Sequence, residues 1–200
     1  MASKSTRKPL QWPICIIDFE ATSLSKQSYP IEVGVCLWTD PSLPARTWGA
    51  LIRPHETWLA EGDWSEEAFA LHGISQQELK DGLTPYQVAE TLLTFCAPAD
   101  LIFCDGGDHD RHWHSRISTA AERGTGILLA SLQKMLFHHG IFDEYEDLSS
   151  KITDRHRALP DAIDIMQRIA KVEGLDLEID LPDASVGPTQ IALAKEALRL

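Results

Sequence analysis

The amino-acid sequence predicts an α/β protein with a mixed sheet of about five strands, the first three antiparallel, and helices on both faces. Three extended segments come first, beginning at Ile14, Ile31 and Arg46, and short loops rich in turn residues separate them. Closely spaced segments of this kind are typical of an antiparallel meander. From Ser65 onward the apolar residues recur mainly at helical spacing, with one more short extended segment at residues 101–104. This order has no long strand and helix alternation, so we expect a mixed sheet.

The first extended segment differs from the second in its apolar pattern. Residues 14–17 are four apolar residues in a row, which is typical of a strand covered on both faces. In residues 31–38 apolar side chains alternate, which places Ile31, Val33, Val35 and Leu37 on one face. The first segment is therefore expected to be buried on both sides.

Three helices have start signals: Ser65 followed by two glutamates, Ser75 with Glu78 as a capping box, and Thr84 before a proline. We expect the first to end at His72. Later helices are expected at residues 110–121, 129–138, 157–172 and 189–198. We divide the 200 residues into a flexible tail (1–11), one domain (12–175) and an extension with a terminal helix (176–200). That helix is expected to pack on the same domain or, in a homodimer, on a partner subunit.

Composition limits the class of protein. The apolar share of 44% and charged share of 24% are ordinary for a globular chain, but the net charge of -12 argues against broad attraction to long duplex nucleic acid. Four cysteines lie in apolar runs without a Cys-x-x-Cys pair, as is typical of reduced thiols in a cytoplasmic protein. No apolar stretch approaches the roughly 18 residues that span a bilayer, so no membrane partner is expected.

Asp18 and Glu20 end the first extended segment. Residues two apart on a strand point to the same face, so the two carboxylates are expected to stand side by side and repel each other. A raised pKa or a bound cation would offset that cost. The ordinary alternative is a pair of exposed acids, which the apolar run before them makes less fitting.

A second candidate pair lies at the start of the helix expected at residues 157–172. His156 comes just before this helix, where the ordinary alternative is a cap or surface residue, and Asp161 comes one turn into it. Because Ala158, Ala162 and Ile163 surround Asp161 in sequence, an unpaired carboxylate there would be costly. Asp161 is therefore a candidate ligand or catalytic acid.

The sequence resembles the DEDD-type 3′→5′ exonucleases, in the DEDDh subgroup that has a His five residues before the last Asp. The motifs, in order, are DFEATSL (18–24), IEVG (31–34), LHGI (71–74), an acid-rich loop (105–110) and HRALPDA (156–162). Asp-x-Glu alone is weak evidence, whereas its combination with His-x(4)-Asp is specific. The resemblance, to the proofreading exonuclease, ribonuclease T and oligoribonuclease group, covers roughly residues 12–172 and implies a ribonuclease H-like fold.

The resemblance implies four metal-binding acids and one base. Asp18 and Glu20 match the first motif, Asp161 matches the last acid and His156 the general base. For the remaining acid we choose Asp110, because an aromatic residue follows three positions later as in the family's second motif. The alternative, Asp108, is expected to cap the helix, with Asp105 as a supporting acid.

The implied activity is hydrolysis of phosphodiester bonds at the 3′ end of single-stranded or short nucleic acids, releasing nucleoside 5′-monophosphates. Two divalent ions about 4 Å apart would be needed, and oxygen ligands favour Mg²⁺ or Mn²⁺. By the resemblance Asp18 bridges both ions, Glu20 and Asp161 hold the one that carries the attacking water, and Asp110 supports the other.

Other residues have weaker assignments. By the resemblance the backbone of Phe19 and the side chain of Leu24 flank the terminal nucleotide, and His72 approaches it or merely ends its helix. Trp64 is expected in the core or on a base, and Glu32 as a structural acid with an unknown partner. The alternatives in function are a non-catalytic module that binds nucleic-acid ends or a protein, and a phosphodiesterase acting on small nucleotides.

Overall fold

The computed structural model describes residues 7–149 and 156–180, which form a six-stranded mixed sheet in the order β5-β4-β1-β2-β3-β6. β1 pairs with β2 and β2 with β3 in antiparallel fashion, whereas the pairs β1–β4, β4–β5 and β3–β6 are parallel. The predicted mixed sheet with three leading antiparallel strands is therefore confirmed. The strands are β1 (Ile14–Ala21), β2 (Pro30–Trp38), β3 (Ala45–Leu51), β4 (Ile102–Cys104), β5 (Leu129–Ser131) and β6 (Ile179–Asp180).

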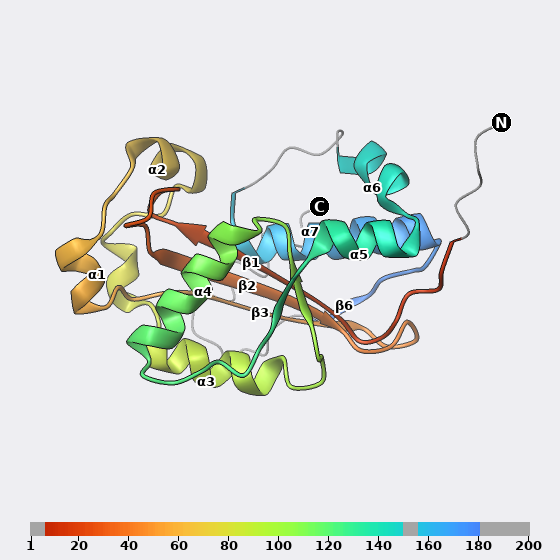
Figure 1. Ribbon diagram of the computed structural model, residues 1–200, viewed down its shortest axis with the longest axis horizontal. Coiled ribbons are helices and arrows are strands. Elements are labelled where there is room, and N and C mark those ends of the chain that lie inside the picture. Colours follow the sequence, from red (N-terminus) through yellow and green to blue (C-terminus); the bar gives the residue numbers. More distant parts are fainter. Residues whose placement is uncertain (1–6, 150–155, 181–200) are drawn as a thin grey trace.

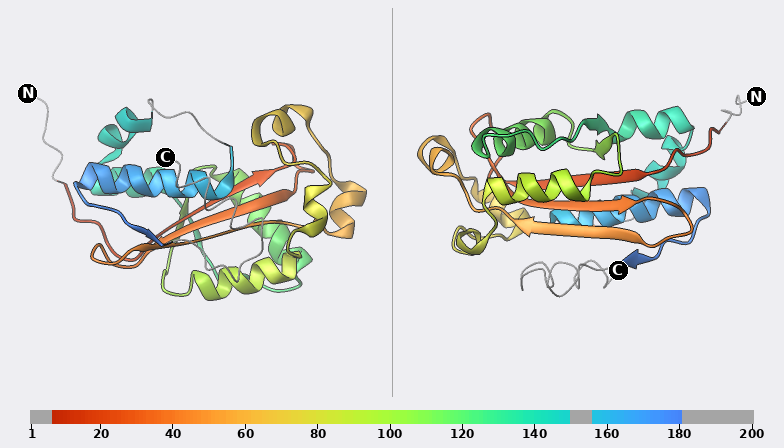
Figure 2. Two further views of the ribbon diagram at one scale, coloured as in Figure 1. Left: turned by 180° about the vertical axis from the view of Figure 1, so that it is seen from behind. Right: turned by 90° about the horizontal axis from the view of Figure 1, so that it is seen from below.

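Helices cover both faces of the sheet, as Figures 1 and 2 show. One face packs against α3 (Pro85–Phe95) and α4 (Asp108–Ala120), and the other against α5 (Leu132–His139), α6 (Phe142–Ser149) and α7 (Ala158–Glu173). The short elements α1 (Glu56–Glu61), α2 (Glu66–His72) and the 3₁₀ turn η1 (Glu78–Asp81) connect β3 to α3. Within the described ranges no helix is long and apolar enough to cross a membrane.

The alternation of side chains along β1 divides the core into two layers. Ile17 and Phe19 belong to the layer under α3 and α4, while Ile14 and Ile16 belong to the layer under α7. Even-numbered residues of this strand therefore face α7. Asp18 is even-numbered as well, so it faces the same helix, as does Glu20 two residues further on.

The cap signals located helix starts correctly but not always helix lengths. Ser65 accepts a hydrogen bond from the Ala68 backbone N–H at 3.2 Å, and Thr84 forms the predicted capping box. Ser75 and Glu78 also hydrogen-bond to each other, yet the helix predicted there is only the 3₁₀ turn η1. The turn stops at a glycine, Gly82, which packs so closely on β3 that an added Cβ would lie 2.7 Å from a backbone oxygen.

Other predicted bounds need correction. Residues 129–131 pair with β4, so the helix predicted from 129 is preceded by β5 and begins at Leu132. The helix predicted from Asp110 begins at Asp108, and Asp108 is no cap: Gly107 holds that position and the Asp108 carboxylate contacts Arg111 at 3.0 Å. The elements α1, α6 and β6 were not predicted from the sequence, and the helix predicted at 189–198 lies outside the described residues.

The first turn of α7 lies directly on β2 at Gly34. A Cβ at this position would lie 2.2 Å from both the carbonyl carbon of Ala158 and the backbone nitrogen of Leu159. Real Cβ atoms do not approach backbone so closely, and backbone atoms cannot rotate away as a side chain does. Gly34 is thus required for α7 to begin where it does.

We expect Gly34→Ala to lower the free energy of unfolding by at least about 2 kcal/mol, because α7 must move off β2 to admit the methyl group. Urea unfolding measures this. Gly124→Ala is the matched control, since an added Cβ there has only one neighbour, at 3.9 Å. Equal stabilities for the two variants would contradict the close packing.

Candidate metal centre and active site

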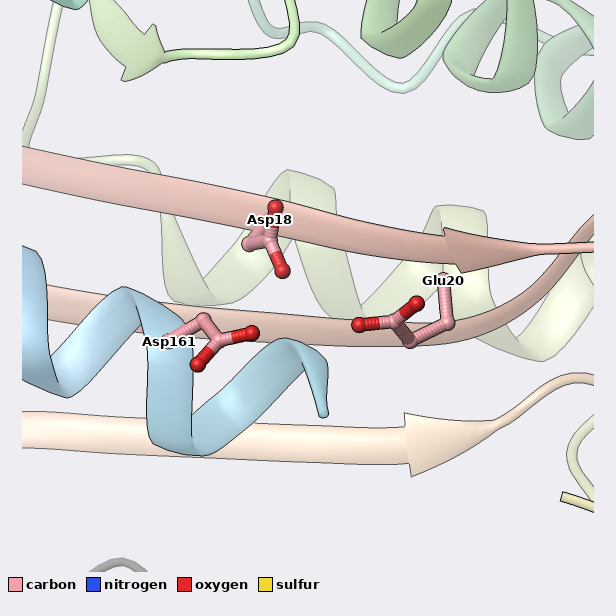
Figure 3. A group of neighbouring side chains, drawn as sticks. All are labelled: Asp18, Glu20 and Asp161. Atoms are coloured by element: carbon pink, nitrogen blue, oxygen red, sulfur yellow. The ribbon is translucent and has the colours of Figure 1, made fainter. Parts of the chain in front are cut away.

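Three carboxylates from two elements meet between the sheet and α7. Oxygen atoms of Asp18, Glu20 and Asp161 all lie within 4.8 Å of one another. Figure 3 shows the two β1 side chains and the α7 side chain pointing into the same space. Residues 143 positions apart in the sequence thus form one cluster of oxygen donors.

The cluster forms part of a cavity of about 250 Å³. The carboxyl end of β1, the residues after β4, the first turn of α4 and the first three turns of α7 surround it. The described residues that line it are Asp18, Phe19, Glu20, Asp105, Gly106, Asp110, Trp113, His156, Asp161, Asp164, Ile165 and Arg168.

Asp110 reaches this cavity from α4, whereas Asp108 points to solvent. Asp110 is 1% exposed, and its carboxylate accepts a hydrogen bond from the Gly106 backbone N–H at 2.9 Å. Glycine at position 106 allows this contact because it has no Cβ, and a Cβ there would lie only 2.8 Å from the carboxylate oxygens. The loop after β4 therefore fixes the direction in which Asp110 points.

Burial and mutual repulsion raise the pKa values of these acids. Burial, followed by the charge of Glu20 and other nearby carboxylates, raises the pKa of Asp18 well above its usual range. The pKa of Glu20 rises to about 8, mainly through burial and then through the charge of Glu32. The pKa of Asp110 rises to about 7 through burial and the charge of Asp105.

This donor set fits divalent cations. Hard carboxylate oxygens are the ligands that Mg²⁺ and Mn²⁺ prefer, and each divalent charge would offset the repulsion that raises these pKa values. Asp18, Glu20 and Asp161 present their oxygens together, and Asp110 lines the same cavity from α4. The residues present therefore suit metal binding.

A buried ion pair fixes the start of α7, and with it Asp161. Glu32 on β2 is fully buried and accepts hydrogen bonds from Arg157 at 2.8 and 3.0 Å and from the Ala158 backbone N–H at 3.0 Å. The carboxylate thus also binds the N-terminus of the helix, where a negative charge is favourable. Asp161 in turn accepts a hydrogen bond from the Arg157 backbone N–H at 3.2 Å. This identifies the unknown partner of Glu32.

His156 lines the cavity just before α7. Its backbone has φ of 50°, in the left-handed region that only a few per cent of residues other than glycine adopt. Arg157 then returns to extended geometry as the N-cap. This change of direction brings the imidazole to the same cavity as the carboxylates.

The remaining predicted residues lie outside the cluster. Leu24 is 72% exposed, and neither it nor His72 is among the described lining residues. His72 is buried at the end of α2, where Nδ1 accepts a hydrogen bond from the Ile74 backbone N–H at 2.9 Å and Nε2 has no hydrogen-bond partner among residues 7–149 and 156–180. The Phe19 side chain belongs to the opposite core layer, and Trp64 packs at the edge of that layer near Phe69.

Three cavity residues were missed or undervalued in the sequence. Asp105 stands beside Asp18, because the parallel pairing of Ile16 with Phe103 places residues 18 and 105 at the same level and on the same face. Asp164 and Arg168 follow Asp161 by three and seven residues on α7. Helix periodicity puts such positions on one face, a signal that the sequence already contained.

Comparison with known proteins gives the class. The RNase_T exonuclease family matches residues 15–168. Among solved structures, the zinc-bound E. coli ExoI complex with single-stranded DNA has a TM-score of 0.62 at 14% identity, covering 82% of this chain and 41% of that one. A 3′-exonuclease solved for its 3′-end specific recognition of histone mRNA stem-loop has a TM-score of 0.58 at 19% identity, covering 82% and 81%. No curated protein sequence matches the chain.

The fold and the family match together define the class of protein. The chain belongs to the RNase_T exonuclease family, because the family match covers most of its length. Its solved neighbours are DEDD-type exonucleases that share the ribonuclease H-like fold, although the chain spans less than half of ExoI. The predicted DEDD-type family and the predicted fold class are thereby confirmed, and the DEDDh subgroup stays a prediction.

Glu32→Gln should lower the free energy of unfolding by about 3 kcal/mol, because it removes the buried negative charge that pairs with the Arg157 guanidinium. Calorimetric titration with Mn²⁺ should also show weaker binding, since the start of α7 is no longer held. Glu61→Gln, at an exposed position on α1, is the matched control and should change neither quantity. Wild-type stability in the Glu32 variant would rule out this role.

Without metal the folded protein should lose stability as the pH rises from about 4.5 to 8. Over this range Glu20, whose pKa is about 8 in the folded state and ordinarily 4.5, holds a proton that the unfolded chain has lost. Thermal unfolding in EDTA should show the decline, and excess Mn²⁺ should reduce it. Glu20→Gln should flatten the EDTA profile. If the stability of the wild type in EDTA changes with pH in the same way as that of Glu20→Gln, the raised pKa of Glu20 is excluded.

Proposed function

We propose that the protein is a metal-dependent 3′→5′ exonuclease that removes nucleoside 5′-monophosphates from single-stranded or short nucleic acids. The observation that carries the proposal is the convergence of Asp18, Glu20, Asp110, His156 and Asp161 on one cavity. Membership of the exonuclease family and a neighbour described as recognising a 3′ end support the polarity.

Two divalent ions, Mg²⁺ or Mn²⁺, would neutralise the phosphate and activate a water molecule. Glu20 and Asp161, with Asp18, are assigned to one ion because their oxygens lie within 4.8 Å of one another. Asp110 is assigned to the second ion, with Asp18 shared between the two. The hydrogen bond from the Gly106 backbone N–H orients Asp110 for this role.

His156 is assigned as the general base. An imidazole titrates near neutral pH and can accept the proton of the attacking water. The water oxygen forms a bond to phosphorus, and the bond from phosphorus to the 3′-oxygen of the preceding nucleotide breaks. The released 3′-oxygen takes a proton from solvent. This scheme produces a 5′-monophosphate and a chain one nucleotide shorter.

The terminal nucleotide is assigned to the surface beside Glu20. The Phe19 backbone borders the cavity there, and the exposed Leu24 side chain lies a few residues further on. His72 can contribute through Nε2. Because Nδ1 accepts a backbone hydrogen bond, the neutral ring carries its proton on Nε2, for which the described part of the chain offers no acceptor. A substrate oxygen would satisfy this donor.

The test is stepwise shortening of a 5′-labelled oligonucleotide from its 3′ end with Mg²⁺ or Mn²⁺, together with release of unlabelled mononucleotides. We expect Asp18→Asn to abolish release and His156→Ala to reduce it by about 10² to 10⁴, the range for loss of a general base. Asp110→Asn should also be severely impaired. Asp108→Asn is its matched control on the same helix and should retain wild-type activity, since that side chain is fully exposed.

Products shortened from the labelled 5′ end, or release that survives Asp18→Asn, would refute the proposal. An absence of both turnover and calorimetric Mn²⁺ binding would instead favour the non-catalytic binding module. Turnover confined to dinucleotides would favour the small-nucleotide phosphodiesterase.

A further inference from the structure

The cavity contains a cation that the proposed reaction does not use. Six of its described lining residues carry carboxyl groups, whereas Arg168 alone among them carries a fixed positive charge. A positive charge strengthens the binding of an anionic substrate only if a negative group of that substrate comes close to it. The position of Arg168 along the cavity determines which phosphate of the substrate can do so.

Arg168 lies at the far end of the cavity from His156. The helix α7 runs opposite to β1 (Figure 1), so its residues pass from the level of Glu20 toward that of Asp18 and beyond. Arg168 follows Asp161 by seven residues on the same face, a rise of about 10 Å. His156 precedes the helix. The base and the guanidinium therefore stand at opposite ends, with the carboxylate cluster between them.

Surrounding side chains hold the guanidinium in place. Its Cζ lies 4.7 Å above the ring of the buried Tyr145 on α6, and its Nε lies 3.4 Å from the Asp164 carbonyl oxygen and 3.9 Å from the Asp164 carboxylate. Stacking uses the flat face of a guanidinium, whereas its N–H groups lie in the plane, where they match the oxygens of a phosphate. Arg168 is thus a preorganised cation.

The stereochemistry of phosphoryl displacement indicates which part of the substrate lies near Arg168. In an in-line displacement the attacking and leaving oxygens lie on opposite sides of phosphorus. If His156 receives the proton of the attacking water, the leaving 3′-oxygen lies toward Asp110 and Arg168. In a 3′→5′ reaction that oxygen belongs to the chain that remains. The next phosphate of that chain is then the first to come near Arg168.

We propose that Arg168, stacked on Tyr145 and tethered by Asp164, binds the phosphate immediately upstream of the scissile one. The inference rests on the proposed exonuclease function. It makes Arg168 a substrate-binding residue that distinguishes substrates with two phosphodiester bonds from those with one. A dinucleotide cannot use it, whereas a trinucleotide can.

The test compares the dinucleotide dTpdT with the trinucleotide dTpdTpdT, or the matched uridine pair if the wild type turns that over faster. For Arg168→Gln we expect kcat/KM on the trinucleotide to fall about tenfold, mainly through KM, the usual size for one charge-assisted contact. On the dinucleotide it should stay within about twofold of wild type. Arg168→Lys should recover part of the loss.

Lys171→Gln is the matched control, because it removes an exposed positive charge from the last turn of the same helix. It should leave both substrates unaffected. A readout independent of turnover is trinucleotide affinity in Ca²⁺, with chromatography to check that the oligomer stays intact. Arg168→Gln should weaken this affinity about tenfold while Mn²⁺ binding by calorimetry is unchanged.

An equal loss of kcat/KM on both substrates would overturn the proposal, because it would show a structural role or a contact with the scissile phosphate. No loss of kcat/KM on either substrate would overturn it as well. Thermal unfolding shows whether the Arg168→Gln protein is folded. If Arg168→Gln does not fold, Arg168→Lys takes its place in the comparison. If the wild type degrades neither of these substrates nor the longer labelled oligonucleotide, the exonuclease proposal fails by itself, and the Ca²⁺ binding comparison still decides the role of Arg168.

Discussion

The placement of α7 on β2 is the constraint on which the rest of this site depends. Gly34 lets the helix backbone touch the strand, and the buried Glu32 carboxylate binds both the Arg157 side chain and the first helical N–H. Neither contact is part of the metal cluster. Together, however, they set where Asp161 stands opposite β1, because Asp161 lies only one turn into the helix. A carboxylate cluster assembled from two elements needs such a rigid junction.

The same junction concentrates negative charge at a cost to the folded state. Burial and repulsion raise the pKa values of Asp18, Glu20 and Asp110, so the metal-free cavity favours protonated acids near neutral pH. The same carboxylates should bind divalent cations, because a divalent charge stabilises the ionised form of a group that does not readily ionise alone. The crowding of these carboxylates therefore affects both the stability of the metal-free protein and its affinity for metal.

The cavity is asymmetric along α7. At one end His156 stands beside the Glu20 side of the cluster, and at the other Arg168 is held between Tyr145 and Asp164. The proposed base comes just before this helix, a proposed metal ligand lies in its first turn and the cation lies about two turns later. The spacing of these groups along a rigid helix gives the site a direction, which a substrate with defined polarity can follow.

The sequence by itself determined the central strands, most helix starts and the acids worth considering, because alternation, cap residues and motif spacing are local properties. It placed Asp18 and Glu20 on one face through the two-residue period of a strand. It erred at residues 129–131, where pairing with β4 outweighed helical periodicity, and at Asp108, where Gly107 took the cap. Only the tertiary structure decided that Arg157 is the partner of Glu32, that Asp105 stands level with Asp18, and that Arg168 shares their cavity. These contacts join residues far apart in the chain, and their geometry follows from how α7 packs across the sheet, which no local pattern encodes.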